Sequence, residues 1–308
     1  MSIFSNPMDE EHHQTGDTEI TEDPSGEEAQ DQETSNTFIS ILSEAVNVIT
    51  DDVLTVQPVQ PVLSAQPVQS VQLMQPVQPL KNKCVIVEIH FNSYGFKKER
   101  FTKKWIDYRI KIFMMYTCRC LMKQTNKNFK AFIYYADQSN SLIQRALRRY
   151  KKLPSNIQFV RISDRDKRVL DCLEGFKHVY FVRVDSDDMY RKNFIAQLHA
   201  FKPKPSTKAL INQRGFWYDS NRKRLAAVVR NSPPFYTLIF NTEDYKKGMR
   251  YPLKGHGSVI RLPHEKFKPR NYMVVIHGKN TSTRYRIRKK TDYRVNRKRI
   301  GKIMKLYR

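Results

Sequence analysis

The sequence predicts an α/β fold in which a mostly parallel sheet carries helices on both faces. From residue 84 to residue 184, strand-length apolar runs alternate with segments that place apolar residues at helical spacing. The apolar runs are nearly continuous, which is typical of strands buried on both sides in a parallel sheet. Ligands of such sheets bind beyond the carboxyl ends of the strands, so we expect functional residues there.

The predicted elements follow one another as strand and helix in turn. In the first long helix, Ile106, Ile110 and Phe113 share one stripe. The second long helix opens with possible capping residues at Ser139 to Ser141. After residue 205 the pattern is less regular, with shorter β-like runs near 208–212, 224–230, 235–240 and 272–277. The expected strands are 84–91, 129–136, 157–162 and 178–184, and the expected helices are 105–124, 139–152 and 165–174.

Charge is divided unevenly along the chain. Residues 1–80 contain 14 Asp or Glu and no Lys or Arg, whereas the other 228 residues contain 55 basic and 16 acidic residues. The first part therefore has a net charge of −14 and the second of +39, which together give the formal +25. A body this basic should attract polyanions or phosphorylated ligands, and added salt should weaken that attraction.

Composition also divides the chain into four parts. Residues 1–55 are acidic and polar and predict a disordered tail, with a possible short helix at 37–50. Residues 56–80 form a degenerate Pro-Val-Gln repeat, which predicts an extended spacer. Residues 81–283 contain the strand and helix pattern and predict the main folded domain, and residues 284–308 form a basic C-terminal tail.

Several classes of protein lose support from what the sequence lacks. It has no phosphate-binding G-x-x-x-x-G-K-[ST] motif and no G-x-G-x-x-G after the first strand, which argues against kinases, ATPases and dinucleotide-dependent enzymes. Its four cysteines lack zinc spacing, and we expect Cys118 and Cys120 to pack in the core. No membrane-length apolar run or signal peptide is seen, so we expect a reduced, cytoplasmic protein.

Three carboxylates at the end of the fourth strand are the most informative feature. Asp185, Asp187 and Asp188 follow "HVYFVRV" directly and form a D-x-D motif. Because like charges this close repel one another, a metal ion or a neighbouring arginine must compensate them. Mg²⁺ or Mn²⁺ would suit carboxylate ligands and leave positions open for substrate phosphates. The alternative is a solvated turn that caps a helix starting near Arg191.

These residues resemble a known family. The order of elements and the "RVDSDD" strand end are similar to the nucleotide-sugar glycosyltransferases of the GT-A fold and, more narrowly, to the bacterial group of rhamnosyltransferases. The likeness also rests on "FMMYTCRCLMKQTNKNFKAFIYYAD", "INQRGFWYD", "NSPPFYTLI" and "VVIHGKN", and it covers most of residues 84–285. It implies a GT-A-like, Rossmann-like sheet and transfer of a sugar from a nucleotide-diphosphate donor, assisted by Mn²⁺ or Mg²⁺.

The resemblance also implies a metal site. Asp187 would be the main metal ligand, Asp185 would reach the metal or the ribose through water, and Asp188 would lie nearest the donor sugar. His277, in "VVIHGKN", matches a late histidine that can complete such a site. The alternative for His277 is a structural role, as for most single histidines.

Two further positions are candidates for binding the donor. Asp137 ends the second strand and matches a carboxylate that such enzymes place against the nucleotide base or ribose; a helix N-terminal role is the alternative. Arg183, which directly precedes the acidic strand end, is the other donor-binding candidate together with Asp185.

An inverting reaction needs a general base on the far face of the sugar. Glu243 and Asp244, in "NTEDYKKG", are the preferred candidates after residue 200, and helix capping is their alternative role. A retaining reaction needs no such base, so both outcomes stay open.

A rival hypothesis comes from the basic C-terminal stretch. Residues 284–308 interleave Lys and Arg with tyrosines, a pattern that can grip phosphates and stack on nucleic-acid bases. The chain would then be a non-catalytic nucleic-acid or polyanion-binding protein. In a combined hypothesis, this stretch holds an anionic polymer or glycan that accepts the sugar. The aromatic pair Phe216 and Trp217 is expected either to stack on a sugar or to pack in the core.

Overall fold

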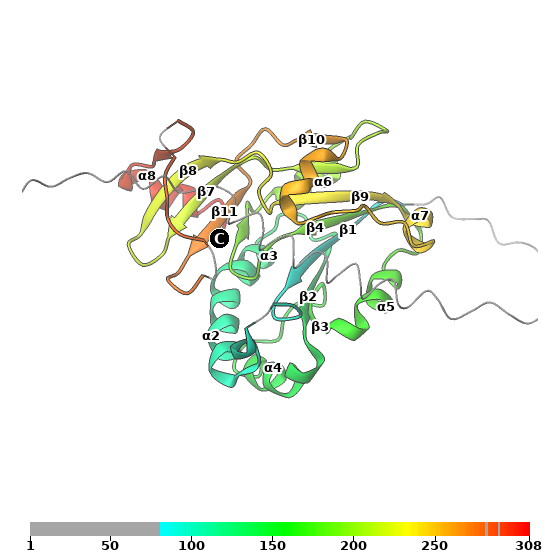
Figure 1. Ribbon diagram of the computed structural model, residues 1–308, viewed down its shortest axis with the longest axis horizontal. Helices are drawn as coiled ribbons and strands as arrows, with labels where there is room; N and C mark the ends of the chain where they lie inside the picture. The colour runs from blue at the N-terminus through cyan, green and yellow to red at the C-terminus, as the bar shows by residue number, and fades with distance from the viewer. Residues whose placement is uncertain (1–80, 96, 281–282, 289) are drawn as a thin grey trace, which may run out of the picture.

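The computed structural model describes residues 81–308, apart from positions 96, 281–282 and 289 (Figure 1). The tail predicted at 1–55 and the spacer predicted at 56–80 lie outside the described residues. In the central seven-stranded sheet, β4, β1, β2 and β3 run parallel, whereas β9 runs antiparallel to β4. From edge to edge its strands are β10 (His264–Lys266), β6 (Ala209–Ile211), β9 (Tyr236–Asn241), β4 (Phe176–Arg183), β1 (Lys81–His90), β2 (Lys130–Tyr135) and β3 (Ile157–Arg161).

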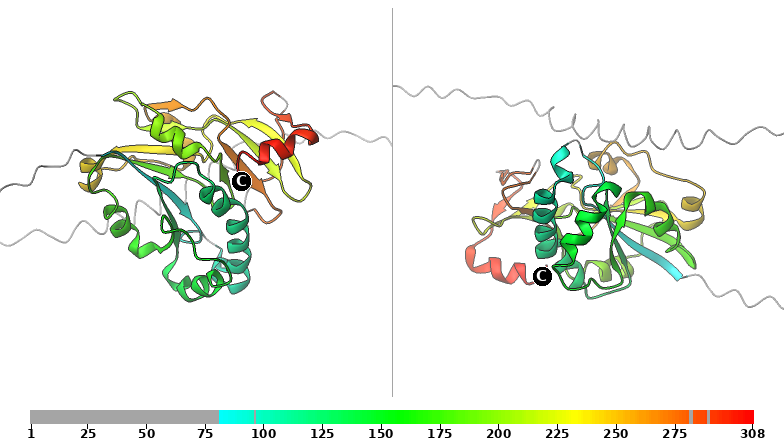
Figure 2. Two further views of the ribbon diagram at one scale, coloured as in Figure 1. Left: turned by 180° about the vertical axis from the view of Figure 1, so that it is seen from behind. Right: turned by 90° about the horizontal axis from the view of Figure 1, so that it is seen from below.

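Helices cover both faces of this sheet, as predicted (Figures 1 and 2). Helices α2 (Lys103–Phe113), α4 (Asn140–Leu147) and α6 (Phe194–Ala200) pack in the larger apolar core. Helices α5 (Arg165–Leu170) and α7 (Thr242–Lys246) pack against the opposite face. The predicted α/β class with a mostly parallel central sheet is therefore confirmed.

A second, five-stranded sheet packs beside the first. It contains, in order, β12 (Tyr293–Arg294), β8 (Arg224–Val229), β7 (Arg214–Asp219), β11 (Tyr272–Ile276) and β5 (Met189–Tyr190). Strand β7 was not foreseen as a strand. Its Phe216 is buried and Trp217 is half-buried under the Arg230 guanidinium, so Phe216 follows the core-packing alternative.

The helix predicted at 105–124 is present but is interrupted by a π-helical turn. Helix α2 passes into the π-helical segment Met114–Cys118 and then into α3 (Arg119–Met122). The wider turn keeps three consecutive side chains, at positions 116–118, in the interior. Cys118 and Cys120 are both buried free thiols, which confirms their predicted place in the core.

Residues 284–308, which the sequence predicts to be a basic C-terminal tail, take part in the fold. It contains β12 and helix α8 (Arg297–Met304), and both Met304 and Tyr307 are buried in the larger core. Tyr307 donates its hydroxyl to the Arg270 carbonyl, at 2.8 Å. Among the described residues of the whole chain, no helix is long and apolar enough to cross a bilayer.

Candidate functional site

The acidic turn joins the two sheets. Strand β4 ends at Arg183, and the N–H of Asp188 donates to the Asp185 carbonyl at 3.1 Å to close a turn. Met189 then begins β5 of the second sheet. The turn lies at the carboxyl end of the parallel strands β1 and β4, which is where an α/β sheet binds its ligands.

Asp187 is the centre of the polar contacts in this turn. Its Oδ2 accepts from Arg109 Nη1 at 3.1 Å and from Asn280 Nδ2 at 3.3 Å, and it lies 3.0 Å from His277 Nε2. Burial alone would raise the pKa of Asp187, but the hydrogen bond from His277 and the charge of Arg109 outweigh it and lower the pKa. Asp187 is therefore a carboxylate that the protein keeps ionised in a nearly closed site.

Arg109 supplies positive charge inside the turn. It comes from α2, donates to the Ser186 hydroxyl at 2.7 Å, and reaches within 3.4 Å of His277 Nε2. Its Nε is buried and has no partner among the described residues. The sequence left open whether a metal ion or a neighbouring arginine compensates the carboxylates. The structure contains such an arginine, Arg109.

His277 follows β11 and is fixed from both sides. Its Nδ1 lies 2.9 Å from the Tyr108 hydroxyl of α2, and its backbone N–H donates to Asn280 Oδ1 at 2.8 Å. The imidazole therefore presents Nε2 to Asp187 with little freedom to turn. We call Arg109, Asp187, His277 and Asn280 the strand-end cluster.

Asp188 points the other way, into the second sheet. Its Oδ1 accepts the Val275 N–H of β11 at 2.9 Å, and Thr117 donates to its carbonyl at 2.8 Å. Burial raises the pKa of Asp188 well above its ordinary value, and the charges of Asp187 and Asp185 add to the effect. Asp188 thus ties the acidic turn to β11 and to the π-helical segment.

Asp185 pairs with a second arginine. Arg183 Nη2 lies 3.2 Å from Asp185 Oδ1, and the Asp185 side chain is 43% exposed. Arg183 Nη1 is buried and has no partner among the described residues. Nearby, Arg165 bonds Glu88 at 2.9 Å. Burial, with the charges of Arg165 and Arg183, lowers the pKa of His90 to about 3, so this imidazole is neutral at the end of β1.

Asp137 lies at the same end of the sheet but outside these contacts. It follows β2, is exposed, and accepts a hydrogen bond from the Ser163 hydroxyl beyond β3. It also begins a short 3₁₀ turn ahead of α4. Its predicted contact with a nucleotide stays a prediction.

Glu243 and Asp244 lie at the opposite end of β4. Asn241 pairs with His178 near the start of β4, seven residues before Asp185, which corresponds to about 20 Å along a strand. Both carboxylates are exposed in the first turn of α7, and Asn241 caps that helix. Because β9 runs antiparallel to β4, the structure does not bring this pair to the acidic turn; the pair lies instead in the first turn of α7, where acidic side chains suit the helix dipole.

The predicted metal ligands are brought together only in part. Asp187 and His277 are adjacent, whereas Asp185 faces Arg183. The described residues contain no group of three His, Cys, Asp or Glu side chains arranged to hold a metal ion. A third protein ligand is thus not supplied by this arrangement.

Three residues of the site were missed in the sequence. Arg109 follows Ile106 by three positions and so borders the buried stripe of the helix; a basic residue there is a usable signal. Asn280 belongs to the quoted "VVIHGKN" but received no role. Tyr108 carried no signal, because exposed and buried tyrosines look alike in a sequence.

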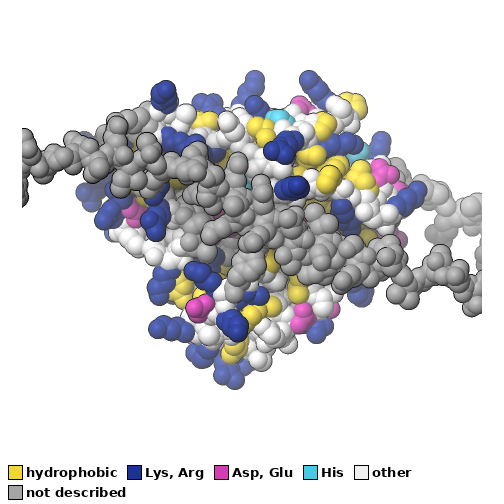
Figure 3. Space-filling model, viewed as in Figure 1, with side chains coloured by type: hydrophobic (Ala, Val, Ile, Leu, Met, Phe, Trp, Pro, Cys, Tyr) yellow, Lys and Arg dark blue, Asp and Glu magenta, His cyan; other side chains and the backbone are white. Residues whose placement is uncertain are grey.

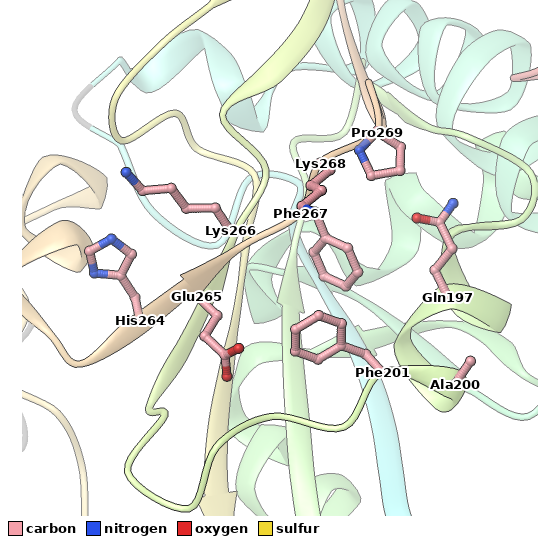
Figure 4. Close-up of a pocket in the computed structure, with 9 residues that line it drawn as sticks. All are labelled: Gln197, Ala200, Phe201, His264, Glu265, Lys266, Phe267, Lys268 and Pro269. Atoms are coloured by element: carbon pink, nitrogen blue, oxygen red, sulfur yellow. The ribbon is translucent and has the colours of Figure 1, made fainter.

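A pocket lies elsewhere, between α6 and β10 (Figure 4). It measures about 700 Å³, and the rings of Phe201 and Phe267 meet in it at 5.0 Å. Glu265, on β10, accepts from Thr207. None of the residues of the strand-end cluster lines it.

No curated protein matches the chain. Among solved structures, TarS residues 1–349 from S. aureus with UDP-GlcNAc is 15% identical, with 66% of this chain and 62% of that chain covered at a TM-score of 0.38. The 4-diphosphocytidyl-2C-methyl-D-erythritol synthase from Anaerococcus prevotii is 11% identical, with 63% and 87% covered at 0.30.

These scores are low, and the fold class rests on the strand order above. The match to a family model, in contrast, covers most of the described domain. Residues 95–284, more than half of the chain, match the family described as putative rhamnosyl transferase, and they include Arg109, the acidic turn and His277. The chain therefore belongs to the putative rhamnosyl transferase family of glycosyltransferases.

Proposed function

We propose that the chain transfers a sugar from a nucleoside-diphosphate donor whose diphosphate binds at the acidic turn. The observation that carries this proposal is the pair of arginines at that turn, Arg109 and Arg183. Each has a buried guanidinium N–H without a partner among the described residues. A buried donor left unpaired is costly, and an oxyanion is the acceptor that best satisfies a guanidinium.

A divalent ion is the second part of the proposal. Asp187 Oδ2 is a donor type that both Mn²⁺ and Mg²⁺ prefer, whereas His277 Nε2, 3.0 Å away, is a nitrogen donor that fits Mn²⁺ better than Mg²⁺; donor phosphate and water would fill further positions. Asp185 would act on the ribose or through water. Arg109 Nη1 lies within 3.4 Å of both donor atoms, so it would have to withdraw. The ion would supply Lewis-acid stabilisation of the departing diphosphate.

The protein's own groups have distinct roles in this proposal. Arg109 and Arg183 would stabilise the negative charge that grows on the leaving diphosphate. Asp188 would fix the turn through Val275, beside the donor sugar. Asp137, at the end of β2, would contact the base or ribose. Glu243 and Asp244 are too far away to act as the base that an inverting transfer needs.

The acceptor and the compartment are proposed from charge and cysteine chemistry. Lys and Arg side chains are spread over the face in Figure 3, with few Asp or Glu among them. An anionic glycan or polymer would suit such a surface.

All four cysteines are free thiols, which supports a reducing, cytoplasmic compartment.

The test is release of nucleoside diphosphate from a panel of nucleotide sugars with Mn²⁺ present. We expect one donor to be turned over slowly with water as acceptor, and Asp187→Asn to reduce the rate at least 100-fold. Asp171→Asn removes an exposed carboxylate paired with Lys167 and should leave the rate unchanged. Equal rates in the wild type and Asp187→Asn, or no turnover of any donor, would overturn the proposal.

A further inference from the structure

A second pocket gathers positive charge beside α8. It measures about 360 Å³ and lies between α3, the β7–β8 turn and α8. Arg119, Lys223, Lys305 and Arg308 line it, and none of the lining residues is acidic. Tyr218 and the apolar side chains of Ile300 and Met304 complete the wall.

Within the described part of the chain, these cations have no side-chain carboxylate as a partner. None of the four forms an ion pair with a side-chain carboxylate among the described residues. Asp219, the carboxylate nearest to Lys223 in the sequence, already pairs with Arg224 at 2.6 Å. Like charges that converge on one pocket repel one another, so a bound anion would relieve this arrangement.

Lys223 occupies its place at a conformational cost. Its φ is 51°, and it is the one non-glycine residue with positive φ in the described part of the chain. Asn or Gly adopts this left-handed conformation more readily than Lys does. The turn therefore carries a lysine at a position where the backbone conformation favours Gly, Asn or Asp.

Two elements that line the pocket continue toward the strand-end cluster, although no residue belongs to both. Thr117, which donates to the Asp188 carbonyl, precedes Arg119 by two residues, about 3 Å along a helix axis. On the other wall, Ser220 N–H donates to the Ile276 carbonyl at 2.9 Å, just before His277. Ser220 follows Tyr218 by about 7 Å of strand. The end of the chain lies beside α3 and β11 in Figures 1 and 2.

We infer that this pocket binds a phosphate group carried by the sugar acceptor and so holds the acceptor next to the donor site. The inference rests on the proposed function and names its acceptor class, a phosphorylated glycan or polymer. The apolar wall formed by Ile300 and Met304 would contact the uncharged part of that ligand. Arg119, Lys223 and Lys305 would set its affinity.

The test is equilibrium dialysis of the full chain with radiolabelled inorganic phosphate. We expect Lys305→Glu and Arg119→Glu each to weaken phosphate binding at least about tenfold. The matched controls are Lys302→Glu, on the same helix, and Lys123→Glu, just after α3; both side chains are exposed and outside the pocket, and each should change affinity less than threefold.

Lys223→Asn separates charge from misfolding. Asn tolerates the left-handed backbone, so this variant should melt no lower than the wild type while binding phosphate several-fold more weakly. Equal loss in lining and control variants would overturn the inference, because it would indicate diffuse charge. Absence of phosphate binding in the wild type would overturn it as well.

A second arm separates this pocket from the donor site. Phosphate is titrated with Mg²⁺ and saturating nucleoside diphosphate present, and we expect its affinity to persist. If nucleoside diphosphate instead weakens phosphate binding, phosphate binds at the donor site and the inference is overturned. If no nucleoside diphosphate binds and the variant pattern still holds, the pocket stands as an anion site while the proposed function fails.

Discussion

The Arg109 guanidinium lies 3.1 Å from the Asp187 carboxylate, and the two side chains are only 15% and 11% exposed. A largely buried carboxylate that loses its cation is left uncompensated. We therefore expect Arg109→Ala to lower the free energy of unfolding by roughly 3 kcal/mol in the presence of a chelator. Mn²⁺ should then raise the melting temperature of the variant more than that of the wild type, because the ion replaces the missing charge.

Arg149→Ala is the matched control for this comparison. Arg149 is 52% exposed and pairs with Asp107 on the surface, so its loss should cost less than about 1 kcal/mol. An equal response to Mn²⁺ in Arg109→Ala and the wild type would contradict the view that Arg109 and the ion compete for one position.

Glu243 and Asp244 are expected to be dispensable for turnover. They lie at the far end of β4, so neither can take a proton from an acceptor bound at the acidic turn. Glu243→Gln and Asp244→Asn should release nucleoside diphosphate within twofold of the wild-type rate. A loss greater than tenfold in either variant, with unchanged melting temperature, would place that carboxylate at the reaction after all.

Gly215 allows the two strands β7 and β11 to approach closely. A Cβ there would overlap the ring of Tyr272, which is fully buried and stacked on Phe235 at 4.1 Å. Gly215→Ala should therefore lower the free energy of unfolding by about 1–3 kcal/mol. Gly301→Ala in α8 meets open space and should instead stabilise by about 0.5–1 kcal/mol. Chemical denaturation of both variants checks the pair.

Asp292 links the C-terminal segment to β8. Its carboxylate, buried against Arg230 at 2.8 Å, would have a raised pKa from burial alone, but Arg230 and the Arg288 N–H lower it to about 2. Because the folded-state pKa lies below the unfolded one, this pair stabilises the protein above about pH 4 and stops doing so as pH falls toward 2.

We expect Asp292→Asn to lower the free energy of unfolding by roughly 2 kcal/mol at pH 7. The difference from the wild type should shrink between about pH 4 and pH 2, measured by denaturation at each pH. A difference that is constant across this range would show that packing, and not the charge of Asp292, accounts for the loss.

Much of the central sheet could be predicted because its strands are short apolar runs between amphipathic helices. Strands β1 to β4 each lie within two or three residues of the predicted bounds. The sequence could not reveal that β9 is antiparallel to β4, because an apolar run has no direction in space. Strand β7 was hidden because its aromatic and charged residues also fit a loop that binds a ligand.

The candidate site was predictable where it is local in sequence. The acidic turn and His277 were found because each follows a recognisable strand. Arg109 was missed because its partner, Asp187, is 78 residues away and only the folding of α2 onto the turn brings them together. Glu243 and Asp244 were misplaced for the same reason: the direction of β9 decides which end of the sheet they reach.

The central claim is that the acidic turn binds a donor's diphosphate. The most direct measurement is the melting temperature of the full chain with Mn²⁺ and a panel of nucleoside diphosphates, repeated on Asp187→Ala. A ligand that binds only the folded state must raise this temperature. We predict that one nucleoside diphosphate raises it in the wild type and that the rise is lost in the variant. No rise with any nucleoside diphosphate, or an equal rise in Asp187→Ala, would contradict the account.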